Sequence, residues 1–125
     1  MDLEEPSEPS SIVALGQSAK PSRGQQEITS FDRRELNLIN GVYGRMLALG
    51  LARDYAIDLT RETAVFSIFR RTSENPLYRV EKRPKDAGRQ GAWSVVSASG
   101  GILRRGRDLK QVLRVLDQKL LKSVD

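Results

Sequence analysis

Cysteine and histidine are both absent from the 125 residues of the chain. Without cysteine there is no disulfide framework, no thiolate metal site and no thiol nucleophile. Without histidine the chain lacks the usual general base near neutral pH and the commonest transition-metal ligand. These two absences exclude a serine–histidine triad or a histidine-bearing zinc site within this chain. Carboxylate-only metal sites, serine–lysine pairs and paired carboxylates stay open.

Long apolar runs are missing too. No stretch approaches the roughly 20 residues that an apolar helix needs to span a bilayer. The acidic residues Asp2, Glu4 and Glu5 stand where a secretory signal would carry positive charge. We therefore expect a cytoplasmic protein that makes no membrane contact.

Basic residues outnumber acidic ones, but unevenly along the chain. Residues 1–27 hold five acids and two bases, whereas the remainder holds 19 bases and 11 acids. A weakly acidic tail beside a basic body predicts a polyanionic partner. The alternative is that the charge only keeps a solvated surface soluble.

The first 28 residues are rich in Ser, Pro, Glu, Gln and Gly. Such a segment buries too little apolar area to offset its ordering entropy, so we expect residues 1–28 to be a disordered tail. One short patch, Ile12–Leu15, is apolar and could order on a protein partner. The alternative for this patch is an apolar spot without a role. Residues 29–125 are then a single domain.

Two segments show helical spacing. In residues 31–49 the apolar positions Leu36, Ile39, Tyr43 and Met46 recur at steps of three and four. Thr29 or Ser30 is the predicted N-cap, and Gly50 is the predicted stop. The second helix is predicted to begin at the N-cap Asp108. Its apolar stripe consists of Leu109, Val112, Leu113, Leu116 and Leu120.

Alternation of apolar and polar residues between the helices predicts five short strands. They cover residues 55–59, 64–71, 77–83, 92–98 and 102–105. The connections are short, which favours antiparallel pairing of consecutive strands. The predicted fold class is therefore α+β, an antiparallel five-stranded meander sheet with an N-terminal and a C-terminal helix on one face, preceded by the disordered tail.

The other face of this sheet is predicted to carry aromatic and guanidinium groups. Its expected members are Phe69, Arg71, Arg79, Glu81, Arg83 and one of Arg104 or Arg105. Such a face suits stacked bases and phosphates. The alternative is a solvated face on which the arginines pair with Glu81 across strands. A register error of one residue would reverse each assignment.

A second set of basic residues falls in the predicted loops and strand ends. It comprises Lys82, Arg83, Lys85, Arg89, Arg104, Arg105 and Arg107. Clustered bases of this kind give salt-dependent, sequence-independent affinity for phosphates. The sequence does not establish that these side chains converge.

Several short motifs resemble a known family. They are Phe31-x-x-x-Glu35-Leu36, Tyr43-Gly44-Arg45, Arg53-Asp54-Tyr55-Ala56-Ile57-Asp58, Pro76-Leu77-Tyr78-Arg79-x-Glu81-Lys82 and Arg105-Gly106-x-Asp108-Leu109. Together they resemble the uncharacterised, mostly alphaproteobacterial domain-of-unknown-function 2794 family, over about residues 30–117. The resemblance implies a bacterial cytosolic protein. It implies no activity, cofactor or catalytic residue.

The leading functional hypothesis is a non-enzymatic binding module that holds nucleic acid or another polyanion. Its predicted contacts are Phe69, Arg71, Arg79, Lys82, Arg83, Lys85, Arg89, Arg104 and Arg105. The alternative is a protein-interaction or regulatory adaptor that uses Ile12–Leu15 or an edge strand. An enzyme ranks third. We predict no catalytic residue, metal or cofactor, and the oligomeric state stays open.

Overall fold

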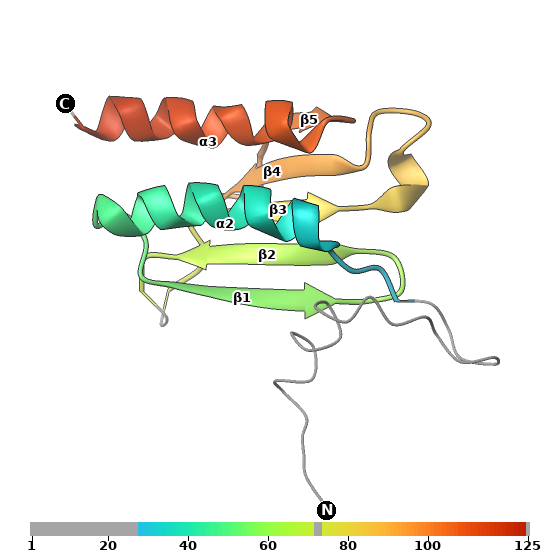
Figure 1. Cartoon of the computed structure of the whole chain (residues 1–125), viewed down its shortest axis with the longest axis horizontal. Helices are drawn as coiled ribbons and strands as arrows, with labels where there is room; N and C mark the ends of the chain where they lie inside the picture. Colours follow the sequence, from blue (N-terminus) through green and yellow to red (C-terminus); the bar gives the residue numbers. More distant parts are fainter. Residues whose placement is uncertain (1–27, 72–73, 125) are drawn as a thin grey trace, which may run out of the picture.

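The computed structural model describes residues 28–71 and 74–124, which form two long helices and one sheet (Figure 1). The predicted tail up to residue 27, with its apolar patch, lies outside the described residues. In chain order the elements are α2 (Arg33–Ala48), β1 (Asp54–Leu59), β2 (Ala64–Phe69), β3 (Tyr78–Lys82), the 3-10 helix η1 (Pro84–Asp86), β4 (Trp93–Ser97), β5 (Ile102–Gly106) and α3 (Leu109–Val124).

The sheet is the predicted antiparallel meander, with strand order β1-β2-β3-β4-β5. Turn chemistry explains its tight connections. Thr60 closes the β1–β2 turn, since its amide donates to the Thr63 carbonyl at 2.8 Å. Gly100 adopts a φ of 94° in the β4–β5 turn, a value that side-chain-bearing residues rarely take. These turns set the start of each pairing, and the β4–β5 register then shifts between Val95 and Val96.

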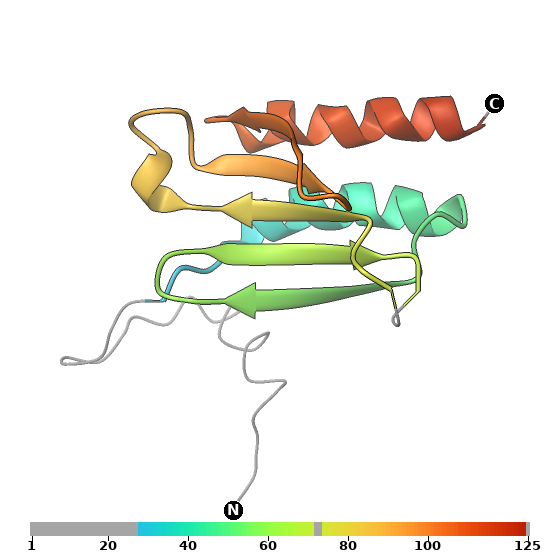
Figure 2. The same cartoon turned by 180° about the vertical axis from the view of Figure 1, so that it is seen from behind.

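Both helices cover the same face of the sheet, and the opposite face carries no helix (Figures 1 and 2). The core lies between these two layers. Its fully buried members include Phe31, Ile39, Met46, Phe66, Ile68, Val80, Val95, Val112 and Leu116. Phe31 stacks on Trp93 with ring centroids 6.1 Å apart, which joins the start of α2 to β4. The predicted fold class is confirmed.

Helix α2 begins two or three residues later than predicted. Its N-cap is Asp32, whose carboxylate accepts a hydrogen bond from the Glu35 amide at 2.8 Å. The Glu35 side chain accepts in return from the Asp32 amide at 2.9 Å. This reciprocal pair satisfies two helix-end donors, so Thr29 and Ser30 are not the cap. The predicted stop is confirmed, since Gly50 has a φ of 74°.

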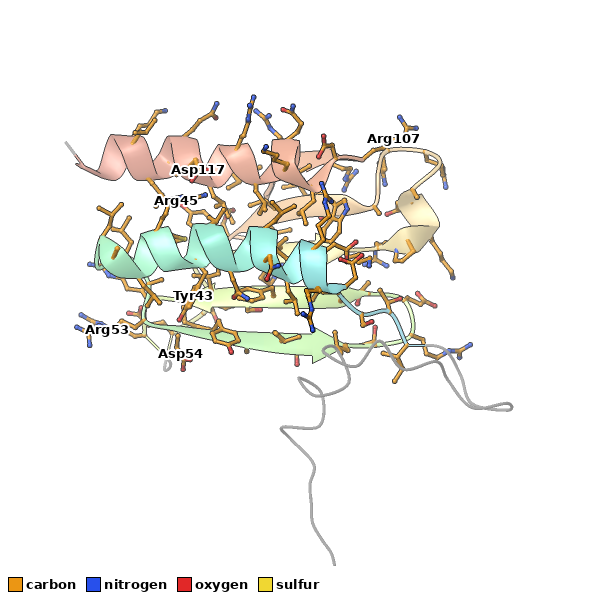
Figure 3. All side chains as sticks on the ribbon, viewed as in Figure 1. Tyr43, Arg45, Arg53, Asp54, Arg107 and Asp117 are labelled. Atoms are coloured by element: carbon orange, nitrogen blue, oxygen red, sulfur yellow. The ribbon has the colours of Figure 1, made fainter. Side chains whose placement is uncertain are left out.

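Helix α3 follows its predicted pattern. The Asp108 carboxylate accepts from the Lys110 amide at 3.0 Å, and all five predicted stripe residues are buried. The two helices run side by side in the same direction (Figure 1). Arg45 of α2 and Asp117 of α3 link them through two hydrogen bonds of 2.9 and 3.2 Å, and Figure 3 labels both side chains between the helices.

The β3–β4 connection packs closely against the end of β5. Gly91 is buried there with a φ of 96°. A Cβ at this position would overlap the Gly106 carbonyl group and lie 2.6 Å from the Arg107 nitrogen. Only glycine fits without displacement of the backbone. Gly106 itself is the last residue of β5, so this strand extends one residue beyond its predicted end at residue 105.

Candidate functional site

The sheet face without helices carries acids as well as bases. Phe69 and Arg79 lie on this face, because they alternate with buried positions along β2 and β3. The Arg79 Nε donates to a Glu81 carboxylate oxygen at 3.2 Å. Phe69 pairs with Asp54 at one end of the sheet. The face is therefore a mixed surface of acids and bases, and its central arginine is already paired with Glu81.

A denser group of bases lies at the end of the sheet where β3 ends and β4 begins. We call it the basic rim, and it consists of Arg83, Lys85, Arg89, Arg105 and Arg107. Three of the five belong to the loop of residues 83–91, and the other two are bound to that loop. Figure 3 labels Arg107 beside this loop. The structure thus brings together most of the bases predicted in loops and strand ends.

Hydrogen bonds fix the rim from within. The Arg107 guanidinium donates to the carbonyls of Ala87, Gly88 and Arg89 at 3.1, 3.3 and 3.5 Å. Arg105 Nη1 donates to the Gln90 side-chain oxygen at 2.6 Å. These contacts hold the loop against β5 and leave the guanidinium charges uncompensated, because a carbonyl or amide oxygen carries no net charge.

Only two acids form ion pairs with rim cations among residues 28–71 and 74–124. Arg83 Nε lies 3.8 Å from an Asp86 oxygen, and Lys85 Nζ lies 3.5 Å from a Glu62 oxygen. The side chains of Lys85 and Glu62 are 72% and 57% exposed, so water screens this pair strongly. Five cations against two carboxylates leave the rim with a net positive charge.

Lys82 is placed apart from the other predicted contacts. It lies on the helix side of β3, where its Nζ donates to the Ser30 carbonyl and to Glu35 Oε1, both at 2.7 Å. The ammonium also lies 5.6 Å from the centre of the Trp93 ring. Only 19% of this side chain is exposed. Lys82 therefore stabilises the start of α2, and we leave it out of the proposed ligand contacts.

The remaining predicted contacts, Arg71 and Arg104, do not reach the rim. Arg104 pairs with Val95 in the middle of the outermost strand and is exposed. Arg71 follows β2 at the opposite end of the sheet. There it lines a pocket of about 450 Å³ together with Gly50, Arg53 and Arg70. We call these four residues the arginine pocket. Its members Arg53 and Arg70 were missed by the sequence reasoning.

Two tyrosines have perturbed acidities. Burial raises the pKa of Tyr43 above its ordinary 10.0, and the Asp54 carboxylate and Tyr55 add to the rise. Burial also raises the pKa of Tyr78. The Tyr43 ring contacts Tyr55 and Phe66 edge-on, with centroids 5.3 and 5.9 Å away. This packing shows that Tyr43 joins α2 to β1 and β2.

The described ranges, 28–71 and 74–124, contain neither a cluster of metal ligands nor a helix that could span a membrane. No group of three or more acidic side chains there is arranged to hold a metal ion. No helix in that part of the chain is long and apolar enough to cross a membrane. The surfaces that stand out in this part of the chain are the basic rim and the arginine pocket.

The fold places the chain in a structural class, a small α+β domain with two parallel helices on one face of an antiparallel meander sheet. Residues 29–113 match the family described as "Protein of unknown function (DUF2794)", and the chain belongs to that family. The matched range includes both basic surfaces. No curated protein and no solved structure shows a significant match to the chain.

Proposed function

We propose that this domain is a non-enzymatic binding module that holds a polyanion, with nucleic acid as the favoured ligand, through the basic rim. The observation that carries the proposal is the gathering of five cations on and against one hydrogen-bonded loop, where only two of them form ion pairs with acids among the described residues. A ligand with regularly spaced phosphates neutralises such a surface and releases its own counterions.

The internal bonds of the rim support this function through preorganisation. Arg105 and Arg107 are held by the loop, so they lose little freedom when a phosphate arrives. Arg89 has no side-chain partner among the described residues, and Lys85 makes only its long contact to Glu62. These two exposed side chains are the ones best able to reach toward a ligand.

The basic rim is also better suited to bind a polyanion than the open sheet face is. On that face Arg79 is paired with Glu81, and Phe69 lies next to Asp54. Stacking of bases on Phe69 would bring them beside a carboxylate and far from the rim. We therefore expect contacts to phosphates to dominate, with little discrimination between sequences.

The test is fluorescence anisotropy of the full chain with a labelled single-stranded oligothymidylate. We expect affinity to fall linearly with salt on a double-logarithmic plot between about 50 and 200 mM, with a slope of about −0.7 per phosphate contacted. Substitution of Lys85→Gln together with Arg89→Gln should flatten that slope by about 1.4. No binding at low salt, or binding that salt does not weaken, refutes the proposal.

A matched control separates the rim from overall charge. Arg114→Gln together with Lys122→Gln removes the same two positive charges from exposed positions of α3. This pair should reduce the affinity much less than the rim pair. Equal losses from both pairs would mean that net charge alone attracts the oligonucleotide.

The adaptor function stays a prediction with less support. Its apolar patch in the tail lies outside the described residues. The two edges of the sheet, β1 and β5, could accept a partner strand. They carry Asp54 and Asp58 on one edge and Arg104 and Arg105 on the other, charges of the kind that discourage strand addition. Deletion of residues 1–27 tests docking through the tail. If the tail docks a protein partner, the shortened chain should stay folded but no longer bind that partner in a pull-down.

A further inference from the structure

The arginine pocket lies at the end of the sheet opposite the rim, and the strand pairing explains its formation. Asp54 at the start of β1 pairs with Phe69 at the end of β2. The Arg53 amide donates to the Phe69 carbonyl at 2.8 Å, one step further along. Arg53 and Arg70 therefore flank the same open end of the hairpin, and Figure 3 shows Arg53 extending outward there.

The charges of this pocket are poorly compensated. Arg71 Nη1 lies 3.8 Å from a Glu74 oxygen, a long contact in which the arginine side chain is 70% exposed. Arg53 and Arg70 have no side-chain partner among the described residues. The C-terminal end of α2, next to Gly50, contributes only about half a negative charge. Three guanidinium groups around one cavity of about 450 Å³ therefore repel one another until an anion is bound.

A cleft with mostly apolar walls adjoins the pocket, so the structure favours a ligand that also has an apolar part. Arg70 also lines a smaller cavity of about 200 Å³, whose other walls are Met46, Leu51, Leu77, Tyr78, Leu120 and one further base, Lys119. The two cavities share this one side chain, so a ligand with its anionic group at the arginines can place an apolar or aromatic group against the cleft. The first cavity is also much larger than one phosphate group, which leaves room for an organic moiety.

We propose that Arg53, Arg70 and Arg71 bind the phosphate group of a small phosphomonoester whose apolar part occupies the cleft beside Arg70. Guanidinium groups suit this ligand because each offers paired donors to a phosphate, and the strongest such contacts are bidentate. The site is separate from the basic rim, so the proposal stands independently of polyanion binding.

Amide chemical-shift mapping of the isotopically labelled full chain tests the proposal, with phenyl phosphate as the probe. We expect the largest shifts at Gly50, Arg53, Arg70 and Arg71. Arg53→Gln together with Arg70→Gln should weaken binding by about tenfold or more. Both side chains are exposed, so the fold should tolerate these changes. The rim pair Lys85→Gln and Arg89→Gln is the matched control and should leave phenyl phosphate affinity unchanged.

Three results would overturn the assignment in different ways. Shifts confined to the rim, or equal losses from the two double variants, would show that the arginine pocket is not the site. Inorganic phosphate that binds as tightly as phenyl phosphate would remove the role of the cleft. A loss of oligothymidylate binding in the pocket variant equal to that in the rim variant would make the pocket part of one polyanion surface.

Discussion

Substitution of Gly91 by alanine should damage the domain more than any other single methyl addition at its glycines. Two separate effects act at this position. Its φ of 96° disfavours any residue with a side chain, at about 1–2 kcal/mol. The new Cβ would also overlap the Gly106 carbonyl and crowd the Arg107 nitrogen at 2.6 Å, and overpacking of this kind costs about 1–3 kcal/mol. The expected total loss is about 2–5 kcal/mol.

The chain contains the controls that separate these effects. Gly100 has nearly the same φ, 94°, but a Cβ there would meet nothing within 4 Å. Gly100→Ala therefore reports the backbone effect alone, a loss of about 1–2 kcal/mol in the free energy of unfolding. The lower entropy of the unfolded alanine chain offsets part of this loss. Gly44 lies exposed inside α2 with no neighbour within 4 Å, so Gly44→Ala should stabilise the domain by about 0.5–1 kcal/mol.

Urea unfolding followed by circular dichroism measures all three variants on one scale. Each kcal/mol corresponds to about 4–8 °C in melting temperature for a domain of this size, so thermal unfolding should show the same order. Gly91→Ala should lose about 1–3 kcal/mol more than Gly100→Ala. Equal free energies of unfolding for these two variants would refute the close approach of the β3–β4 loop to β5.

Two more changes test other parts of the structure. Lys82→Met should lower the free energy of unfolding by about 1–3 kcal/mol, because it removes two hydrogen bonds of 2.7 Å from a side chain that is 19% exposed. Oligothymidylate affinity measured alongside should fall less than in the rim pair, and a larger fall would place Lys82 among the ligand contacts. Tyr43 has a pKa raised by burial, so the folded state resists its ionisation and stability should decline as the pH rises above about 10. Urea midpoints should fall across that alkaline range less steeply in Tyr43→Phe, and identical profiles would count against a buried phenol.

Local patterns were enough to predict the sheet and its two faces. Consecutive strands are joined by connections that need no crossover, so strand order followed from the chain itself. Alternation is clear in β3 but absent from β5, whose pairing with β4 shifts register between Val95 and Val96. The cap of α2 was missed although its signal was present. Asp32 and Glu35 form a capping box at the required spacing, but Thr29 and Ser30 offered competing caps with the usual residue types. When two suitable N-caps lie close together in the sequence, tertiary packing decides which one is used. Here the packing of Phe31 against Trp93 favours Asp32.

The basic residues show where sequence reasoning ends. Alternation along β3 already placed Lys82 on the face opposite Arg79, but its partners Ser30 and Glu35 come from a distant segment. The arginine pocket had a detectable signal, because the short β1–β2 turn fixes the register that sets Arg53 beside the end of β2. Its cavity depends on Gly50 at the end of α2, and no local pattern indicates how that helix end meets the hairpin.

The parallel arrangement of α2 and α3 has a consequence for the charge of the whole domain. Parallel helix dipoles reinforce one another, so the shared N-terminal end near the basic rim needs carboxylates. Asp32, Glu35 and Asp108 meet that need, each through a hydrogen bond to a backbone amide at the start of a helix. Glu35 also pairs with Lys82 at 2.7 Å, and among the described residues none of these three acids forms an ion pair with a cation of the basic rim. The domain can thus keep an uncompensated positive edge although its sequence contains many carboxylates.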